Sequence, residues 1–305
     1  MIQQADDFRA EAAELRRLLN GLSDSDWTRA TQFKAWTIDD IIRHLHMGDR
    51  MALASASDPA EFTALMADIQ AERKKGLSRP GGLRPFGHRA AGGVTAAPEF
   101  TSQMADTQGE RNKGLSHIDE TGQRVKGLGG RPLLQRWHET AEQLCTALAE
   151  KPADTRLKWA GPDMGVRMFT TARQMEAWSH AQAIYDLLGI ERPAASPRLR
   201  NIAEIGVRTF GWAYRNRGLP VPPVTPSVRL DTPFGETWEW KASDSDSVEG
   251  SAIAFCQVVT QTRNVADTPL SIHGETARDW MRIVQCFAGP PETPPAPGTR
   301  YRSPR

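Results

Sequence analysis

Two residues with metal-binding side chains lie four positions apart in the segment Met175-Glu-Ala-Trp-Ser-His180. The surrounding sequence, from about 170 to 188, has the pattern of a helix, so Glu176 and His180 share one face with Cβ atoms roughly 5–6 Å apart. A carboxylate and an imidazole at this distance can bind one divalent ion, although the same spacing is also common in solvated pairs. A catalytic zinc normally has about three protein ligands, so a metal site here needs a ligand from another element.

Two histidines near the N-terminus are candidates for that third ligand. Thr37 has the character of an N-cap, followed by two aspartates where the helix dipole favours negative charge, and a helix is expected to about residue 55. His44 and His46 both fall at the margins of its apolar stripe, so periodicity does not choose between them. The stripe consists of Ile38, Ile41, Ile42, Leu45 and Ala52.

Apolar periodicity predicts three further helices, at about 6–22, 133–150 and 197–217. With the two helices above, they favour a first domain over residues 1–220, an up-and-down bundle of about four main helices. Residues 221–291 alternate as a hairpin and then show two short helical patterns, so we expect a small α+β module. The proline-rich tail, 292–305, is expected to be disordered. The fold class is therefore mainly α.

A local duplication interrupts the first domain. Residues 61–78 and 99–116 are identical at 13 of 18 positions, and the segment between them is rich in Gly, Ala, Arg and Pro. One repeat pair is too few for a solenoid, so we expect an irregular insertion over about 61–131. Tolerance of a surface insertion explains it more simply than a lid over the metal does.

The amino-acid composition limits the classes of function that we expect for this protein. The 38 basic and 37 acidic residues nearly balance, so no general polyanion-binding surface is implied and nucleic acid is not an expected partner. No apolar stretch is long enough to cross a bilayer, and the N-terminus has no signal core, so we expect a cytoplasmic protein. The three cysteines, Cys145, Cys256 and Cys286, have the pattern of reduced core residues, and no catalytic nucleophile stands out.

The two candidate ligand segments together resemble a known family. Trp36-Thr-Ile-Asp-Asp-Ile-Ile-Arg-His44-Leu and the later Glu176-Ala-Trp-Ser-His180 are similar to the metal-binding domain of mycothiol-dependent maleylpyruvate isomerase, in the DinB-like four-helix bundle superfamily. The resemblance implies a divalent metal, commonly zinc, bound by His44, Glu176 and His180. It thereby selects His44 over His46, and it implies mycothiol or a similar low-molecular-weight thiol as co-substrate.

Other segments of the chain indicate a particular subfamily, and one position departs from the pattern of the family. The chain looks like an uncharacterised subfamily whose C-terminal part, from about 226 to 291, resembles a wyosine-base-formation-type or sterol-carrier-like module. Members of the family often carry an aspartate three residues after the second histidine, whereas this chain has Ala183. This departure concerns catalysis more than metal binding.

The function expected from these observations is that of a divalent-metal-binding protein of the thiol-dependent isomerase or transferase type, acting on a small organic substrate. The alternative is a non-catalytic metal- or small-molecule-binding protein on the same fold. A role as an RNA-modification accessory is suggested only by the C-terminal resemblance, and the balanced charge argues against it. Arg208, in an otherwise apolar helical segment, could bind an anionic substrate or pair with a buried acid.

Overall fold

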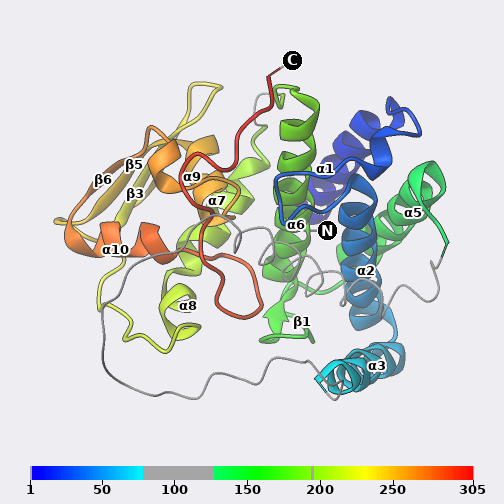
Figure 1. Ribbon diagram of the computed structural model, residues 1–305. Helices are drawn as coiled ribbons and strands as arrows, with labels where there is room; N and C mark the ends of the chain where they lie inside the picture. The colour runs from blue at the N-terminus through cyan, green and yellow to red at the C-terminus, as the bar shows by residue number, and fades with distance from the viewer. Residues whose placement is uncertain (1, 78–126, 194–195, 305) are drawn as a thin grey trace, which may run out of the picture.

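A computed structural model describes residues 2–77, 127–193 and 196–304 of the chain, with side chains left out for 70–77. It is mainly helical, as the sequence predicts, and a small sheet occupies its C-terminal part (Figure 1). Within the described residues, no helix is long and apolar enough to cross a membrane.

Four helices form the N-terminal bundle, which confirms the predicted architecture. They are α1 (Gln3–Asn20), α2 (Ile38–Ser57), α5 (Gly130–Ala149) and α6 (Val166–Leu188). Helix α2 packs along α5, while α1 contacts both α5 and α6. The predicted apolar stripe of α2 is completely buried in the first of two apolar clusters. The bundle therefore fixes the position of α2 relative to α6.

Local sequence signals set the ends of the two helices that carry the candidate ligands. Thr37 caps α2 through a capping box, in which its Oγ1 accepts a hydrogen bond from Asp40 N at 3.1 Å and Asp40 Oδ2 accepts one from Thr37 N at 2.9 Å. Helix α6 ends at Gly189, whose φ of 66° is in the left-handed region that glycine adopts most readily. These caps hold the register of both helices.

Helix α6 separates the two apolar clusters of the molecule. One face packs in the bundle, whereas Met175 and Trp178 belong to the second cluster, with α7 (Leu199–Arg208) and α8 (Phe210–Arg215). We expected one helix over 197–217, but the chain bends at Thr209 between α7 and α8. The division at residue 220 stays a prediction, although α7 and α8 contribute side chains to the second cluster.

The C-terminal module contains a four-stranded mixed sheet in the order β4-β3-β5-β6, with β3 and β5 parallel. The predicted hairpin is present, because β3 (Ser227–Asp231) pairs with β4 (Thr237–Trp240) in antiparallel register. The other elements of this module are β5 (Ser247–Ser251), α9 (Ala252–Val259), η3 (Val265–Asp267), β6 (Ser271–His273) and α10 (Glu275–Ile283). The connections of the bundle contain η1 (Asp26–Thr28) and the two-residue strands β1 (Arg156–Leu157) and β2 (Met164–Gly165).

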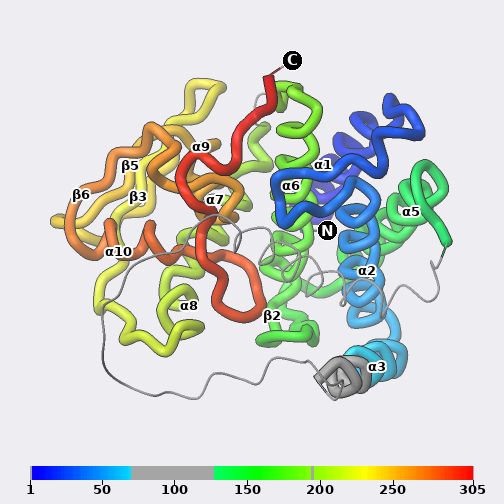
Figure 2. Tube along the Cα trace, viewed as in Figure 1, coloured from blue at the N-terminus to red at the C-terminus, as the bar shows by residue number. Residues whose placement is uncertain are grey.

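Two expectations about irregular segments need correction. Most of the first repeat copy lies in helix α3 (Pro59–Leu77) rather than in an irregular excursion, while 78–126, with the second copy, lies outside the described residues. The tail at 292–304, expected to be disordered, runs beside both parts of the molecule (Figure 2). The backbone carbonyls of Glu292 and Pro295 accept hydrogen bonds from the side chains of Gln261 and Asn264. The prolines of the tail also reduce the conformational entropy that this segment loses when its position is fixed.

Candidate metal centre

His44, Glu176 and His180 meet at the face where α2 packs against α6. Glu176 Oε2 lies 3.5 Å from His44 Nε2 and 3.3 Å from His180 Nε2. One ligand atom from each of the three residues lies within 4.8 Å of the others. The structure therefore brings together the three residues that the sequence resemblance selected, as a candidate metal site.

The separations between these donor atoms suit a divalent transition metal. Ligands at about 2.0–2.1 Å from a tetrahedral ion lie about 3.3–3.4 Å from one another. The two distances from Glu176 Oε2 are close to this spacing, and all three donor atoms lie within 4.8 Å of one another. Two imidazoles and one carboxylate are also a donor set that zinc and similar ions accept, and three protein ligands leave at least one position open.

The electrostatics of the site favour the protonation states that metal ligands need. Burial lowers the pKa of His180 to about 4, although the Glu176 carboxylate acts in the opposite direction, so this imidazole is neutral at pH 7. Burial alone would raise the pKa of Glu176, but hydrogen bonds from His180 and His44 outweigh it and hold that pKa well below its usual range. The carboxylate is therefore ionised beside a neutral imidazole, as metal binding requires.

An aromatic wall from the loop before α2 covers the two imidazoles. The Trp36 ring stacks on His180 at 6.0 Å and 9°, and it lies 5.2 Å from the ring of His44. Phe33 meets His180 edge-on at 5.0 Å. Between the two aromatic residues, Lys34 and Ala35 adopt φ values of 50° and 54°, which side chains other than glycine rarely adopt. This strained turn places both rings on the candidate ligands.

The remaining histidines in the described part of the chain do not join this site. His46, the alternative that periodicity left open, is buried on another face of α2, where burial and the charges of Arg50 and Arg136 lower its pKa to about 4. His138 lies near Arg16 and Glu142, and His273 contacts Ser271. His88 and His117 lie outside the described residues.

Arg208 lies away from the candidate ligands. Its side chain is 64% exposed and pairs with Glu204 on α7, whose other carboxylate oxygen accepts a hydrogen bond from Trp240 Nε1. Of the two roles that the sequence left open, pairing with an acid is the one observed, although at the surface. A role in substrate binding gains no support from this position.

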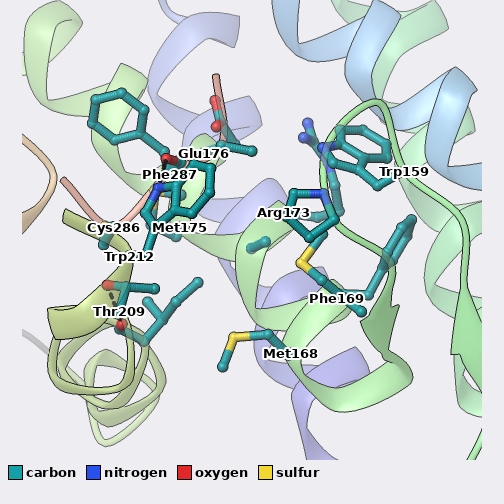
Figure 3. Close-up of a pocket in the computed structure, with 15 residues that line it drawn as sticks. Trp159, Met168, Phe169, Arg173, Met175, Glu176, Thr209, Trp212, Cys286 and Phe287 are labelled. Atoms are coloured by element: carbon teal, nitrogen blue, oxygen red, sulfur yellow. Dashed lines mark hydrogen bonds between the residues drawn. The ribbon is translucent and has the colours of Figure 1, made fainter. Parts of the chain in front are cut away.

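A pocket of about 200 Å³ opens beside Glu176, between α6, the α7–α8 bend and the segment 286–288. In Figure 3, Trp159, Phe169 and Arg173 lie on one side, and Thr209, Trp212 and Cys286 on the other. Most of the wall is apolar. Its residues are Trp159, Pro162, Met164, Met168, Phe169, Ala172, Arg173, Met175, Glu176, Ile205, Thr209, Trp212, Cys286, Phe287 and Ala288.

A buried ion pair at this pocket was missed by sequence reasoning. Arg173 Nε donates a hydrogen bond to Asp49 Oδ1 at 2.9 Å, and Trp137 Nε1 donates one to Asp49 Oδ2 at 2.8 Å. Arg173 and Asp49 are only 5% and 1% exposed. The sequence offered one sign of this pair, which is that each residue lies close to a candidate ligand along the chain. Arg173 lies three residues before Glu176, and Asp49 lies five residues after His44.

Comparison with known proteins supports the sequence resemblance. The family described as the mycothiol maleylpyruvate isomerase N-terminal domain matches residues 8–84 and 85–185, which include the four bundle helices and all three candidate ligands. The chain belongs to this family. The boundary between the two matches, at residues 84 and 85, lies outside the described residues.

Similar proteins also align with most of the chain. The uncharacterised proteins Rv0036c and MT0041, from two strains of Mycobacterium tuberculosis, are each 34% identical over 287 residues, covering 93% of this chain and 95% of the relative. Among solved structures, mycothiol-dependent maleylpyruvate isomerase and a mutant of it align with a TM-score of 0.44 at 16% and 15% identity. These alignments cover 84% of this chain and 87% of the isomerase.

Proposed function

We propose that this protein binds one divalent metal ion, most simply zinc, through His44, Glu176 and His180. We further propose that it uses a low-molecular-weight thiol, mycothiol or a similar compound, in an isomerase or transferase reaction on a small organic substrate. The observation that carries the proposal is the position of Glu176, which belongs both to the three-residue cluster and to the wall of the pocket. A ligand in the pocket therefore lies next to the candidate metal ligands.

The protein's own side chains have distinct tasks in this proposal. His44, Glu176 and His180 hold the ion, while Trp36 packs against both imidazoles and Phe33 packs against that of His180. When bound, such an ion polarises a carbonyl or favours the thiolate form of a thiol near neutral pH. Glu176 remains ionised because both imidazoles donate to it or share the ion with it. The apolar walls orient the organic substrate and exclude water.

A second candidate is a non-catalytic protein that binds a metal or a small molecule on the same fold. Ala183, where the resemblance suggests an aspartate, favours it, because this side chain packs against the first apolar cluster and offers no polar group. Measurement of thiol-dependent turnover separates the two candidates. The wyosine-type resemblance of the C-terminal module and a cytoplasmic location remain proposals as well.

Measurement of metal content tests the first part of the proposal, which is that the protein binds one divalent ion. We expect about one zinc or similar ion per chain in protein purified without added metal, and loss of that ion in His44→Ala and Glu176→Ala. His46→Ala is the matched control, because it removes an imidazole from the same helix on another face. If the wild type stays metal-free when zinc is supplied, or if only His46→Ala loses the ion, the ligand assignment is wrong.

A further inference from the structure

Arg173 gives the pocket a buried positive charge beside Glu176. We propose that the pocket is a binding site for a small, largely apolar monocarboxylic acid, with its carboxylate bound by Arg173 and its apolar body between α6 and the α7–α8 bend. The inference rests on the proposed function in one respect, because it takes the ligand of this pocket to be the organic substrate. Binding itself does not depend on the metal.

The guanidinium of Arg173 is only partly used by the protein. Its Nε donates to Asp49 Oδ1 at 2.9 Å, while the other oxygen of Asp49 is taken by Trp137 Nε1. The ion pair is therefore end-on rather than bidentate. Nη2 is buried against Gly48 of α2, so it is not the nitrogen that a ligand can reach. Nη1 likewise has no hydrogen-bond partner within the described residues, and a ligand carboxylate that reaches it would form a charge-assisted hydrogen bond.

The surroundings of Arg173 are shaped to hold this group in place. A Cβ added to Gly48 on α2 would lie 2.6 Å from Nη2, so only glycine leaves room for the guanidinium. The guanidinium carbon lies 5.6 Å from the ring centroid of Trp159, on the same side of the pocket in Figure 3. Asp49, Gly48 and Trp159 therefore fix the orientation of Arg173 before any ligand binds.

Two other polar side chains of the pocket wall are already engaged in hydrogen bonds. Thr209 Oγ1 donates to Ile205 O at 2.7 Å, and Trp212 Nε1 donates to Phe287 O at 3.1 Å. Cys286 is a protonated thiol, because burial raises its pKa. Among the pocket residues described, Arg173 is thus the cation with unused N–H groups, and the remaining surface favours hydrocarbon.

Charge and size define the ligand further. The pocket offers one cation, and Glu176 adds a negative charge to its wall, so a second carboxylate on the ligand would have no partner and would be repelled. A volume of about 200 Å³ is smaller than that of a typical site for drug-sized molecules, so the ligand is a small acid.

Calorimetric titration of the full chain tests the proposal. The protein is His44→Ala treated with a chelator, because carboxylates also bind metals and this variant removes that route. The probes are phenylacetate, its uncharged isostere phenylacetamide, and the dicarboxylate phenylmalonate. We expect phenylacetate to bind about tenfold or more tightly than either of the others, as a charge-assisted hydrogen bond to a buried guanidinium predicts.

Substitutions assign this preference to Arg173. In the same background, Arg173→Lys keeps a charge for Asp49 but loses the fork of N–H groups, and we expect phenylacetate binding to fall about tenfold. Arg208→Lys is the matched control, since that arginine is exposed and paired with Glu204, and it should leave binding unchanged. Should Arg173→Lys fail to fold, Gly48→Ala displaces the guanidinium without changing charge and should give the same loss.

The outcomes separate this inference from the proposed function. Equal binding of the acid and the amide, or no binding of either, would overturn the role of Arg173, while leaving the metal site intact. Conversely, a wild type that holds no metal but binds phenylacetate through Arg173 would retain this site and remove the proposed chemistry.

Discussion

Glu176 Oε2 lies 3.5 Å from His44 Nε2, although the two residues belong to different helices of the bundle. This contact joins α2 and α6 at the point where His180, one turn further along α6, completes the cluster. The position of α2 against α6 therefore decides whether a metal can bind, and changes that disturb the setting of either helix should affect the site.

The aromatic wall is expected to contribute to metal affinity. Trp36→Phe keeps an apolar ring but loses the stacking surface on His180, so we expect zinc affinity to fall roughly tenfold, the lower range for loss of groups that orient ligands. Competition with a chromogenic chelator measures the affinity. Trp159→Phe is the comparison, because that tryptophan lines the pocket instead. Equal losses in both variants would contradict a specific role for Trp36.

The capping box of α2 should contribute measurably to stability. Thr37→Ala removes the acceptor for Asp40 N, and we expect the free energy of unfolding to fall by about 1 kcal/mol in urea titrations. Thr146→Ala on α5 is a suitable control, because its hydroxyl is exposed and bonds only to a carbonyl of its own helix. An effect of equal size in the control would show that capping is not the cause.

Burial of His46 predicts a loss of stability in mild acid. Its pKa is lowered to about 4 by burial, whereas in the unfolded chain it lies near 6.5, so between these values the unfolded state binds more protons. Stability should therefore fall as pH drops below 6.5, by roughly 2 kcal/mol at pH 5, and the effect should level off near pH 4. Urea unfolding of chelator-treated protein at several pH values measures it. His46→Gln should remove this part of the dependence and leave the part that comes from His180, whose pKa is also lowered to about 4, while His273→Gln, at an exposed position, should change little.

The three cysteines should resist modification in the folded protein. Cys145, Cys256 and Cys286 are at most 3% exposed, and burial raises the pKa of each thiol. An aromatic disulfide reagent at pH 8 should therefore react slowly with native protein and with all three thiols in denaturant. Fast reaction of one thiol in the native state would contradict the burial seen here.

Sequence patterns predicted those parts of the fold that depend on neighbours along the chain. The Thr37 cap, the apolar stripe of α2 and the glycine that ends α6 are local signals, and each was confirmed. The choice between His44 and His46 was beyond periodicity, because it depends on which side of α2 faces α6. The resemblance selected His44, and the packing of the bundle agrees.

Pairings between distant elements account for what sequence reasoning missed. Arg173 and Asp49 each look like solvated charges in the sequence, and only the approach of α2 to α6 makes them a buried pair. The tail similarly has few apolar residues of its own, so its contacts with distant side chains could not be predicted. Gly206, just before the break at Thr209, also lies against a distant element, because a Cβ added there would lie 2.9 Å from Val259 and 3.1 Å from Phe255 of α9.

The tail also contacts the loop that forms the aromatic wall. Lys34 Nζ pairs with Glu292 Oε1 at 2.9 Å, Tyr301 N donates to Gln32 Oε1 at 2.7 Å, and the Arg300 guanidinium lies over Phe33. The paired residues are 258 and 269 positions apart in the sequence, so the loop beside the candidate metal centre is supported by a segment that belongs to neither ligand-bearing helix. A substitution in this tail can therefore change the setting of the aromatic wall although it lies far from the candidate ligands along the chain.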